Sequence, residues 1–177
     1  EGRGSAVLFG IKHIFNLNID LKMIIEMDAD LSHNPNELHY NIDYFEKNNL
    51  DMLISSRYRK DSKIINWSMK RKILSFFSNK LTKFLLKIPI SDYTNGYRFY
   101  NRKSAIHLSK SRTMFKGYIN LSETIAKLLK RDFSIAAFPI IFENRKLGKS
   151  NTDLKEMLGS FFAIFQIAAR YWFDRKF

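Results

Sequence analysis

Two aspartates, Asp28 and Asp30, directly follow the apolar run 21–27 and are separated by a single alanine. Two carboxylates at this spacing, where the chain leaves a strand, can face one hard divalent cation together. Mg²⁺ or Mn²⁺ held in this way can bridge the oxygens of a diphosphate. The alternative is structural, with Asp30 capping the turn that follows the strand. The motif is short, so its weight depends on what lies around it.

Seven basic residues and a single acid, Asp61, occupy the segment 57–72. The basic residues are Arg57, Arg59, Lys60, Lys63, Lys70, Arg71 and Lys72. The forked guanidinium group of arginine matches phosphate oxygens, so this segment predicts a site for a phosphorylated substrate. A solvated helix face is the simpler alternative for a charge run. A nucleic-acid groove is a second alternative, because Tyr58 and Trp67 lie between the charges.

A compact polar set follows in the segment 91–102, and it comprises Asp92, Thr94, Asn95, Gly96 and Arg98. Asp92 could accept a hydrogen bond from a sugar hydroxyl or act as a base, and glycine at 96 allows close approach of the backbone. An Asx turn with flanking tyrosines explains the same residues equally well.

Two further titratable residues have a structural interpretation that we favour. His33 comes just after the aspartate pair and is either a ligand or a structural donor, and we expect the structural role. Glu123 lies four residues before Lys127 in a helical segment that is otherwise apolar and basic, so we expect an ion pair on the helix surface.

The elements that must position these residues follow from the spacing of apolar side chains. Helices are expected at 5–15, 37–47, 67–86, 118–130 and 153–173, and strands at 21–27, 52–55 and 135–142. The alternation of strand, helix and strand is typical of an α/β fold with a mostly parallel sheet flanked by helices. Ligands of such sheets bind beyond the carboxyl ends of the strands, where the aspartate pair and Arg57 lie. Pro139 favours an edge position for the last strand.

Length and composition narrow the classes further. The chain has 177 residues, no cysteine and a formal net charge of +13. The lack of cysteine excludes disulfide scaffolds, cysteine-ligated zinc and thiol catalysis. The positive charge points to an anionic partner, which is nucleic acid, an acidic membrane surface or a phosphorylated substrate. The uncharged stretch 157–169 is too short to span a membrane.

Several segments agree in order and spacing with one family. They are GRGSAVLFGIKH, DADLSHNP, SSRY, WSMKRKILS, DYTNGYRFY, the helix around Glu123, FPIIF and NRKLGKS. On these segments, which cover nearly the whole chain, the sequence resembles the family 2 glycosyltransferases. The resemblance is to the dolichol-phosphate mannosyltransferase-like branch, which transfers a hexose to a polyprenyl phosphate. It implies a Rossmann-like fold of the GT-A type.

The resemblance also assigns roles to residues. Asp28 and Asp30 would hold Mg²⁺ or Mn²⁺ on the donor diphosphate, so that Asp30 counts among the catalytic residues. The expected phosphate ligands are Arg57, Arg71 and Ser75 for the acceptor, and Arg145, Lys149 and Ser150, in a closing loop, for the donor. Asp92 and the segment 94–98 would line the sugar and acceptor side, with Asp92 as an optional base.

Two positions depart from the family pattern, namely Ser32, where glutamine is frequent as a further metal ligand, and Asn151, where lysine is frequent. The family's first strands, which bind the nucleoside, have no counterpart before Glu1. We therefore expect a partial catalytic domain over 1–152, with an exposed sheet edge that promotes self-association.

Residues 153–177 are expected to form an amphipathic helix at a membrane surface. Its apolar residues recur at helical spacing and basic residues lie near its end: Leu154, Leu158, Phe161, Phe162, Phe165 and Trp172, with Arg170, Arg175 and Lys176. Such a helix can lie in the bilayer interface. In the alternative, the same face packs on the domain.

These expectations combine into one function. The expected reaction is an inverting, metal-dependent transfer of a hexose from a nucleotide-sugar, of GDP-mannose or UDP-glucose type, to a dolichyl or undecaprenyl phosphate at the cytoplasmic face of a membrane. A phosphate monoester has a second pKa of about 6, so its oxygen needs no strong base at neutral pH. No nucleic acid partner is expected. The alternatives are a non-lipid acceptor, a non-catalytic nucleic-acid-binding domain and an inactive remnant.

Overall fold

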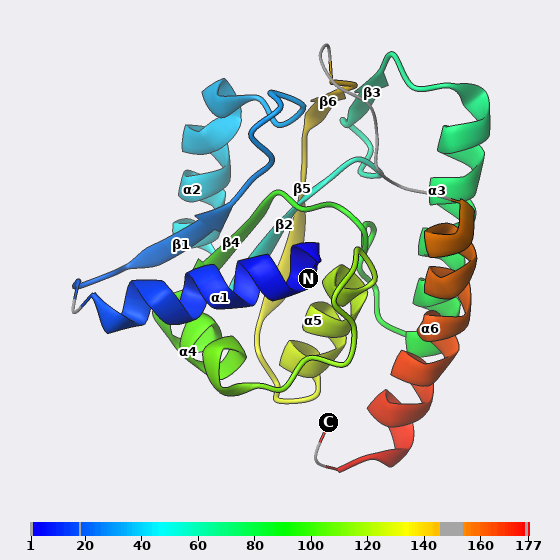
Figure 1. Cartoon of the computed structure of the whole chain (residues 1–177). Helices are drawn as coiled ribbons and strands as arrows, with labels where there is room; N and C mark the ends of the chain where they lie inside the picture. Colours follow the sequence, from blue (N-terminus) through cyan, green and yellow to red (C-terminus); the bar gives the residue numbers. More distant parts are fainter. Residues whose placement is uncertain (1, 18, 146–153, 176) are drawn as a thin grey trace.

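The computed structural model describes residues 2–17, 19–145, 154–175 and 177 (Figure 1). Its helices are α1 (Arg3–Asn16), α2 (Leu38–Lys47), α3 (Met69–Leu86), α4 (Arg102–Lys110), α5 (Asn120–Leu129) and α6 (Leu154–Phe173), with a 3-10 turn, η1 (Pro35–Glu37), before α2. Its strands are β1 (Met23–Glu26), β2 (Met52–Ser56), β3 (Lys63–Ile65), β4 (Arg98–Asn101), β5 (Ile135–Pro139) and β6 (Ile141–Glu143). These elements confirm the α/β class expected from the sequence.

Four strands form the main sheet in the order β1-β4-β2-β5. β2 and β5 are parallel, with Met52 opposite Ile135, whereas β4 is antiparallel to both β1 and β2. β1, β2 and β5 therefore share one direction, and their carboxyl ends lie at the same edge of the sheet. β4 was not predicted from the sequence, because turn formers and aromatic residues dominate the segment 91–102.

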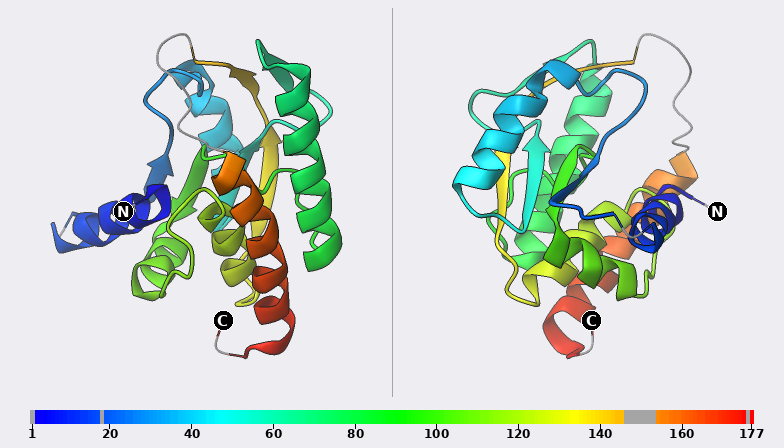
Figure 2. Two further views of the ribbon diagram at one scale, coloured as in Figure 1. Left: turned by 45° about the vertical axis from the view of Figure 1, so that its right-hand side comes forward. Right: turned by 90° about the vertical axis from the view of Figure 1, so that its left-hand side faces the viewer.

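The central strands alternate between two hydrophobic clusters. Met52 and Ile54 point into a cluster with residues of α1, α4, α5 and α6, whereas Leu53 and Phe99 point into a cluster with residues of α2. A pleated strand imposes this period of two. Figure 2 shows α2 on one face of the sheet and α1, α4 and α5 on the other. Burial on both faces fixes the register and therefore fixes which residues emerge at the strand ends.

A second, short parallel sheet pairs β3 with β6 beyond the carboxyl end of the main sheet. The expected strand 135–142 is divided here, because β5 ends at Pro139 and Ile140 donates its backbone N–H to the carbonyl oxygen of Ser56. β5 lies at an edge of the main sheet, as Pro139 predicted. His33 forms an isolated bridge with Phe142 of β6. β6 therefore connects the loop after β1 with the segment after β2.

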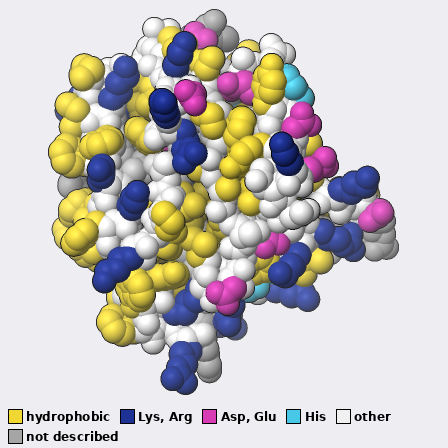
Figure 3. All heavy atoms as spheres, turned by 180° about the vertical axis from the view of Figure 1, so that it is seen from behind, with side chains coloured by type: hydrophobic (Ala, Val, Ile, Leu, Met, Phe, Trp, Pro, Cys, Tyr) yellow, Lys and Arg dark blue, Asp and Glu magenta, His cyan; other side chains and the backbone are white. Residues whose placement is uncertain are grey.

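α3 and α6 pack side by side along one flank of the molecule (Figures 1 and 2). The exposed large apolar side chains of these two helices are Met69, Ile73, Leu74, Phe76, Phe77, Phe84, Phe161, Phe162, Phe165, Trp172 and Phe173. We call this set the α3–α6 flank. Seen from behind in Figure 3, the flank is a broad apolar area interrupted by lysine and arginine side chains.

The buried face of α6 is narrow and aliphatic. It consists of Ala163, Ile164, Ile167 and Ala168, which belong to the larger core cluster. The aromatic residues of this helix named from the sequence are all exposed: Phe161, Phe162, Phe165 and Trp172. The alternative in which this aromatic face packs on the domain is therefore wrong for these four residues. The side chains of Leu154 and Leu158 lie outside the described part. No helix in the described ranges is long and apolar enough to cross a membrane.

Two expectations about organisation stay predictions. The division between residues 1–152 and 153–177 is one of them. Self-association through an exposed edge is the other, and β1 is an edge strand of the main sheet on which it would act.

Candidate active site

Asp28 and Asp30 lie in the loop directly after β1, at the carboxyl edge of the sheet. Their side chains are 40% and 24% exposed, so both carboxylates reach solvent. Asp30 Oδ1 accepts a hydrogen bond from the backbone N–H of Ser32 at 3.0 Å, and Oδ2 lies 3.2 Å from Nε of Arg145. The first contact is the turn-forming role considered above. The second brings an expected donor ligand onto an expected metal ligand.

The surroundings of Asp30 favour its charged form. Partial burial raises the pKa of Asp30, but the hydroxyl and N–H of Ser32 and the charge of Arg145 outweigh burial and hold the pKa below its usual value. Asp30 is therefore a carboxylate at neutral pH, as a ligand for a hard cation must be.

Arg57 and Asp92 form a buried ion pair at the carboxyl end of β2. Nε of Arg57 donates to Oδ2 of Asp92 at 2.8 Å, and Nη2 donates to Oδ1 at 2.9 Å. Asp92 also accepts hydrogen bonds from the backbone N–H groups of Arg57, Thr94 and Asn95. Burial raises the pKa of Asp92, but Arg57 and these donors outweigh it and lower the pKa. Asp92 therefore lies behind Arg57, turned toward protein groups.

Aromatic rings surround the two arginines expected to bind the acceptor. The guanidinium carbon of Arg57 lies 5.1 Å from the ring centroid of Trp67 and 5.6 Å from that of Phe142. That of Arg71 lies 4.1 Å from the centroid of Trp67. Such cation–π contacts orient a guanidinium group without neutralising it. Trp67 thus holds both cations close together.

Arg71 lies in the first turn of α3 and reaches the segment after β6. Its Nη1 donates to Oδ1 of Asn144 at 3.0 Å. Burial lowers the pKa of Arg71, and the charges of Arg57 and Arg145 lower it further. Arg57 and Arg71 both contact the ring of Trp67, and Arg71 reaches the residue before Arg145, so the three guanidinium groups lie in one cluster. A cluster of this kind attracts an anion.

Ser75 lies one helical turn after Arg71 and therefore on the same face of α3. Its side chain lies near the phenol of Tyr58. Burial raises the pKa of Tyr58, whereas the charge of Arg57 and the proximity of Ser75 act in the opposite direction. Ser75 therefore adds a neutral polar group beside the arginines.

The structure thus brings Asp30, Arg57, Arg71 and Arg145 together from four separate segments. Asp28 lies in the same loop as Asp30, and Ser75 extends the cluster along α3. Lys149 and Ser150 lie outside the described residues.

Two residues of the site, Trp67 and Asn144, were not predicted from the sequence. Trp67 was considered only as an aromatic residue between charges, and its place four residues before Arg71 was the available signal. Asn144 directly precedes Arg145 at the end of a strand, which was the corresponding signal for that residue. The contact between Asn144 and Arg71 joins segments 73 residues apart, and no local pattern predicts it.

His33 has the structural role that we favoured. It is fully buried, with the backbone N–H of Asp28 donating to Nδ1 at 2.9 Å and Oδ1 of Asn95 lying 3.0 Å from Nε2. Burial lowers the pKa of His33. Both ring nitrogens are engaged by protein groups.

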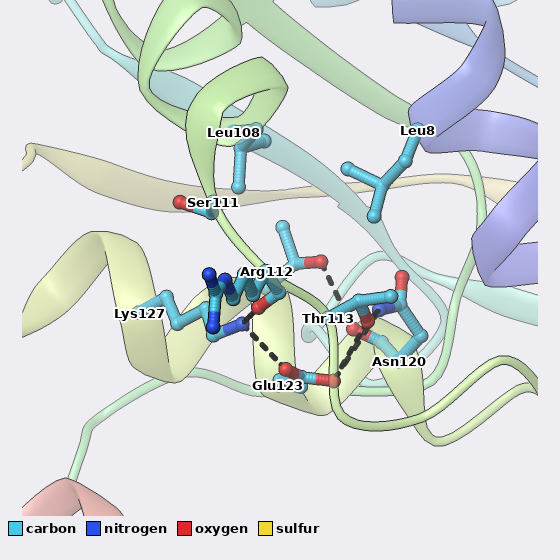
Figure 4. Close-up of a pocket in the computed structure, with 9 residues that line it drawn as sticks. Leu8, Leu108, Ser111, Arg112, Thr113, Asn120, Glu123 and Lys127 are labelled. Atoms are coloured by element: carbon cyan, nitrogen blue, oxygen red, sulfur yellow. Dashed lines mark hydrogen bonds and ion pairs between the residues drawn. The ribbon is translucent and has the colours of Figure 1, made fainter.

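Glu123 lies in a separate small pocket between α1, α4 and α5 (Figure 4). Its ion pair with Lys127, at 2.5 Å, is confirmed, but the expected surface location is wrong because both side chains are buried. Glu123 also accepts hydrogen bonds from the backbone N–H groups of Met114 and Phe115. These contacts hold the segment between α4 and α5, which is a structural task.

The residues after β1 fit a hard divalent cation that takes two ligands from the protein and the others from water and substrate. Within the described ranges, no group of three or more histidine or acidic side chains is arranged to hold a metal. Mg²⁺ commonly uses one or two carboxylates and completes its shell with water and substrate phosphates. Asp28 and Asp30, partly exposed, match that requirement.

Fold and site together define a class of protein. It is an α/β protein whose strand ends present two carboxylates to a cluster of arginines, an arrangement suited to a diphosphate and a second phosphate. The chain matches the model of the glycosyl transferase family 2 over residues 1–109 and belongs to this family. The resemblance found in the sequence is therefore confirmed, and with it the GT-A type of fold.

Two curated relatives are similar over most of the chain. A polyprenol monophosphomannose synthase of Mycolicibacterium smegmatis is 32% identical over 174 residues, which are 98% of this chain and 64% of that protein. An undecaprenyl-phosphate mannosyltransferase of Micrococcus luteus is 30% identical over 153 residues, which are 85% of this chain and 60% of that protein. The chain spans less than two thirds of the length of either relative.

Proposed function

We propose that this chain carries the catalytic residues of a mannosyltransferase that transfers its hexose from a nucleotide-sugar to a polyprenyl phosphate. Both relatives are named for a polyprenyl phosphate that carries mannose, which supports this acceptor and a donor of the GDP-mannose type over UDP-glucose. The observation that carries the proposal is the convergence of Arg57, Arg71 and Arg145 beside Asp30. Such a site offers separate ligands to two phosphate-bearing substrates.

The acceptor phosphate binds to Arg71 and Ser75, with Arg57 behind them. The guanidinium group of Arg71 donates to a neutral amide, that of Asn144. Because its charge is not balanced by this partner, Arg71 is stabilised most by an added anion. Arg57 is already paired with Asp92, so it shapes the wall of the acceptor site and adds little net charge. Asp92 acts through Arg57 by holding its orientation.

The donor diphosphate binds on the side of the aspartates. Asp28 and Asp30 would hold Mg²⁺ or Mn²⁺, which would supply charge neutralisation for the leaving diphosphate. Arg145 exchanges its contact with Asp30 for the diphosphate oxygens. Lys149 and Ser150, which follow Arg145 in the sequence, are proposed as further ligands of the donor. A forked cation next to a metal ligand is well placed for this exchange.

The reaction forms one bond and breaks one. An oxygen of the acceptor phosphate attacks the anomeric carbon, the bond from this carbon to the diphosphate oxygen breaks, and the configuration inverts. No proton transfer is needed, because a phosphate monoester with a second pKa of about 6 is largely a dianion at neutral pH. Positioning and charge stabilisation then supply the catalysis. This explains why Asp92 can be committed to Arg57.

Transfer of labelled sugar to polyprenyl phosphate tests the proposal, with GDP-mannose and UDP-glucose as donors and the natural full-length protein that contains this chain. We expect transfer from GDP-mannose that EDTA stops and that Asp30→Ala abolishes. Asp20→Ala, at a fully exposed carboxylate, is the matched control and keeps wild-type activity. Transfer at an unchanged rate in EDTA contradicts the metal role, and failure of every donor contradicts the function.

We further propose that the α3–α6 flank rests on the cytoplasmic face of the membrane that holds the acceptor. Arg71 and Ser75 lie on α3, so docking of this helix brings the site to the headgroups. Exposed lysines border the apolar residues, among them Lys70, Lys80, Lys83 and Lys87. Exposed aromatic residues with bordering cations favour an interface with anionic lipid.

Flotation with vesicles of phosphatidylcholine and phosphatidylserine tests this orientation. Phe84→Asp is expected to weaken binding by roughly 10- to 150-fold, because burying a phenylalanine contributes roughly 1.5–3 kcal/mol. Phe9→Asp on α1 is the matched control, since Phe9 is 72% exposed and Phe84 is 76% exposed. Equal loss in both variants, or no loss in either, contradicts docking through this flank.

A further inference from the structure

His33 lies between the aspartate loop and the segment that carries Asp92. Its ring stacks on Tyr97, with 5.0 Å between centroids, and meets Phe142 edge-on at 5.6 Å. Because the backbone N–H of Asp28 donates to Nδ1, the ring proton lies on Nε2 and is donated to Oδ1 of Asn95. The tautomer of His33 is therefore fixed by its neighbours.

Asn95 continues the connection toward the acceptor side. Its Oδ1 also accepts the N–H of Gly96 at 3.0 Å, and its Nδ2 donates to the carbonyl oxygen of Ser55 at the end of β2. The backbone N–H of Asn95 donates to Oδ1 of Asp92 at 3.1 Å, and this carboxylate binds Arg57. An unbroken chain of hydrogen bonds thus runs from the backbone of Asp28 to the guanidinium group of Arg57.

We propose that His33 is a positioning residue that fixes the aspartate loop relative to Arg57 through Asn95. This inference rests on the proposed function, because it takes Asp28 and Asp30 as the cation ligands. Each group in this buried network is fixed as either a donor or an acceptor. The network is therefore satisfied in only one arrangement of the two loops. Outer groups that orient metal ligands typically change metal affinity about 10- to 100-fold when removed.

Binding of Mn²⁺ alone, measured by the electron paramagnetic resonance of the free ion, tests this role without any turnover. His33→Phe keeps the ring packing against Tyr97 and Phe142 but removes both hydrogen bonds. We expect its dissociation constant for Mn²⁺ to rise about tenfold or more. His33→Gln offers an acceptor and a donor again, and we expect it to stay within about threefold of wild type.

Two further variants separate positioning from general loss of stability. Asn95→Ala breaks the same connection, so His33→Phe combined with Asn95→Ala is expected to bind Mn²⁺ about as weakly as either single variant. Ser55→Ala is the control. It removes the buried hydrogen bond from Oγ to Asn41 but keeps the carbonyl oxygen that Asn95 uses, so Mn²⁺ binding stays at the wild-type level.

Each outcome decides between these roles. The ¹⁵N shifts of the His33 ring in the wild-type protein are expected to show a proton on Nε2 and none on Nδ1. The proposal is overturned if His33→Phe binds Mn²⁺ like wild type, if the losses in the double variant multiply, or if Ser55→Ala weakens binding equally. A wild-type protein that binds Mn²⁺ neither alone nor with GDP present overturns the metal role in the proposed function as well.

Discussion

The two arginines expected to bind the acceptor phosphate differ in how their charge is balanced by the surrounding protein. At the end of β2, Arg57 is 8% exposed, and its guanidinium group is paired in two-pronged fashion with the buried carboxylate of Asp92. In the first turn of α3, Arg71 is partly exposed and donates to the neutral side chain of Asn144. Burial and two neighbouring arginines lower the pKa of Arg71, whereas beside Asp92 the pKa of Arg57 is raised despite burial.

This difference separates a structural cation from a binding cation within one cluster. A buried ion pair that has all its hydrogen bonds holds its partners in place, and the fold depends on both of them. An arginine among other arginines is stabilised by an added anion, so its free energy changes when substrate binds. We infer that Arg57 shapes the acceptor site and that Arg71 supplies most of the change in interaction on binding.

The largest expected effect is a loss of stability on removing the partner of Arg57. Asp92→Ala leaves Arg57 buried without its carboxylate, and loss of one partner of a buried pair costs about 3–5 kcal/mol. We expect the free energy of unfolding in urea to fall by about this amount. Asp61→Ala, at an exposed carboxylate in the same basic segment, is the control and stays near the wild-type value.

The pH dependence of stability gives this prediction a second test. The folded-state pKa of Asp92 is lower than the unfolded value of about 4, so the unfolded protein binds more protons between the two values. The stabilisation is therefore complete above about pH 4 and is lost as pH falls through the folded-state pKa. Asp92→Asn removes this contribution. Parallel stability curves for Asp92→Asn and wild type below about pH 4 would contradict the assignment.

The parts of the site that the sequence predicts are those set by local position. Asp28 and Asp30 lie in the loop after β1, and Arg57 directly follows β2, so the rule for strand ends was enough to place them at one edge. Arg71 and Ser75 share a helix face because they are four residues apart. In these cases a short stretch of sequence determines both the element and the residue's place on it.

The parts that the sequence did not predict depend on contacts between distant segments. β4 lies between β1 and β2 through pairings such as Ile25 with Phe99, and its four residues give no pattern of their own. The buried location of Glu123 depends on backbone groups of the preceding loop, so the i,i+4 pattern alone indicated a surface pair. The commitment of Asp92 to Arg57 likewise joins residues 35 positions apart.

The most direct test of this account is the acceptor dependence of Arg71→Ala, measured as labelled transfer at varied polyprenyl phosphate together with unfolding in urea. We expect the apparent KM for polyprenyl phosphate to rise about tenfold, which corresponds to roughly 1.4 kcal/mol. We also expect kcat to stay within about threefold and the free energy of unfolding to change by less than about 0.5 kcal/mol. An unchanged KM, or a loss of stability like that of Asp92→Ala, would contradict the division of roles between Arg71 and Arg57.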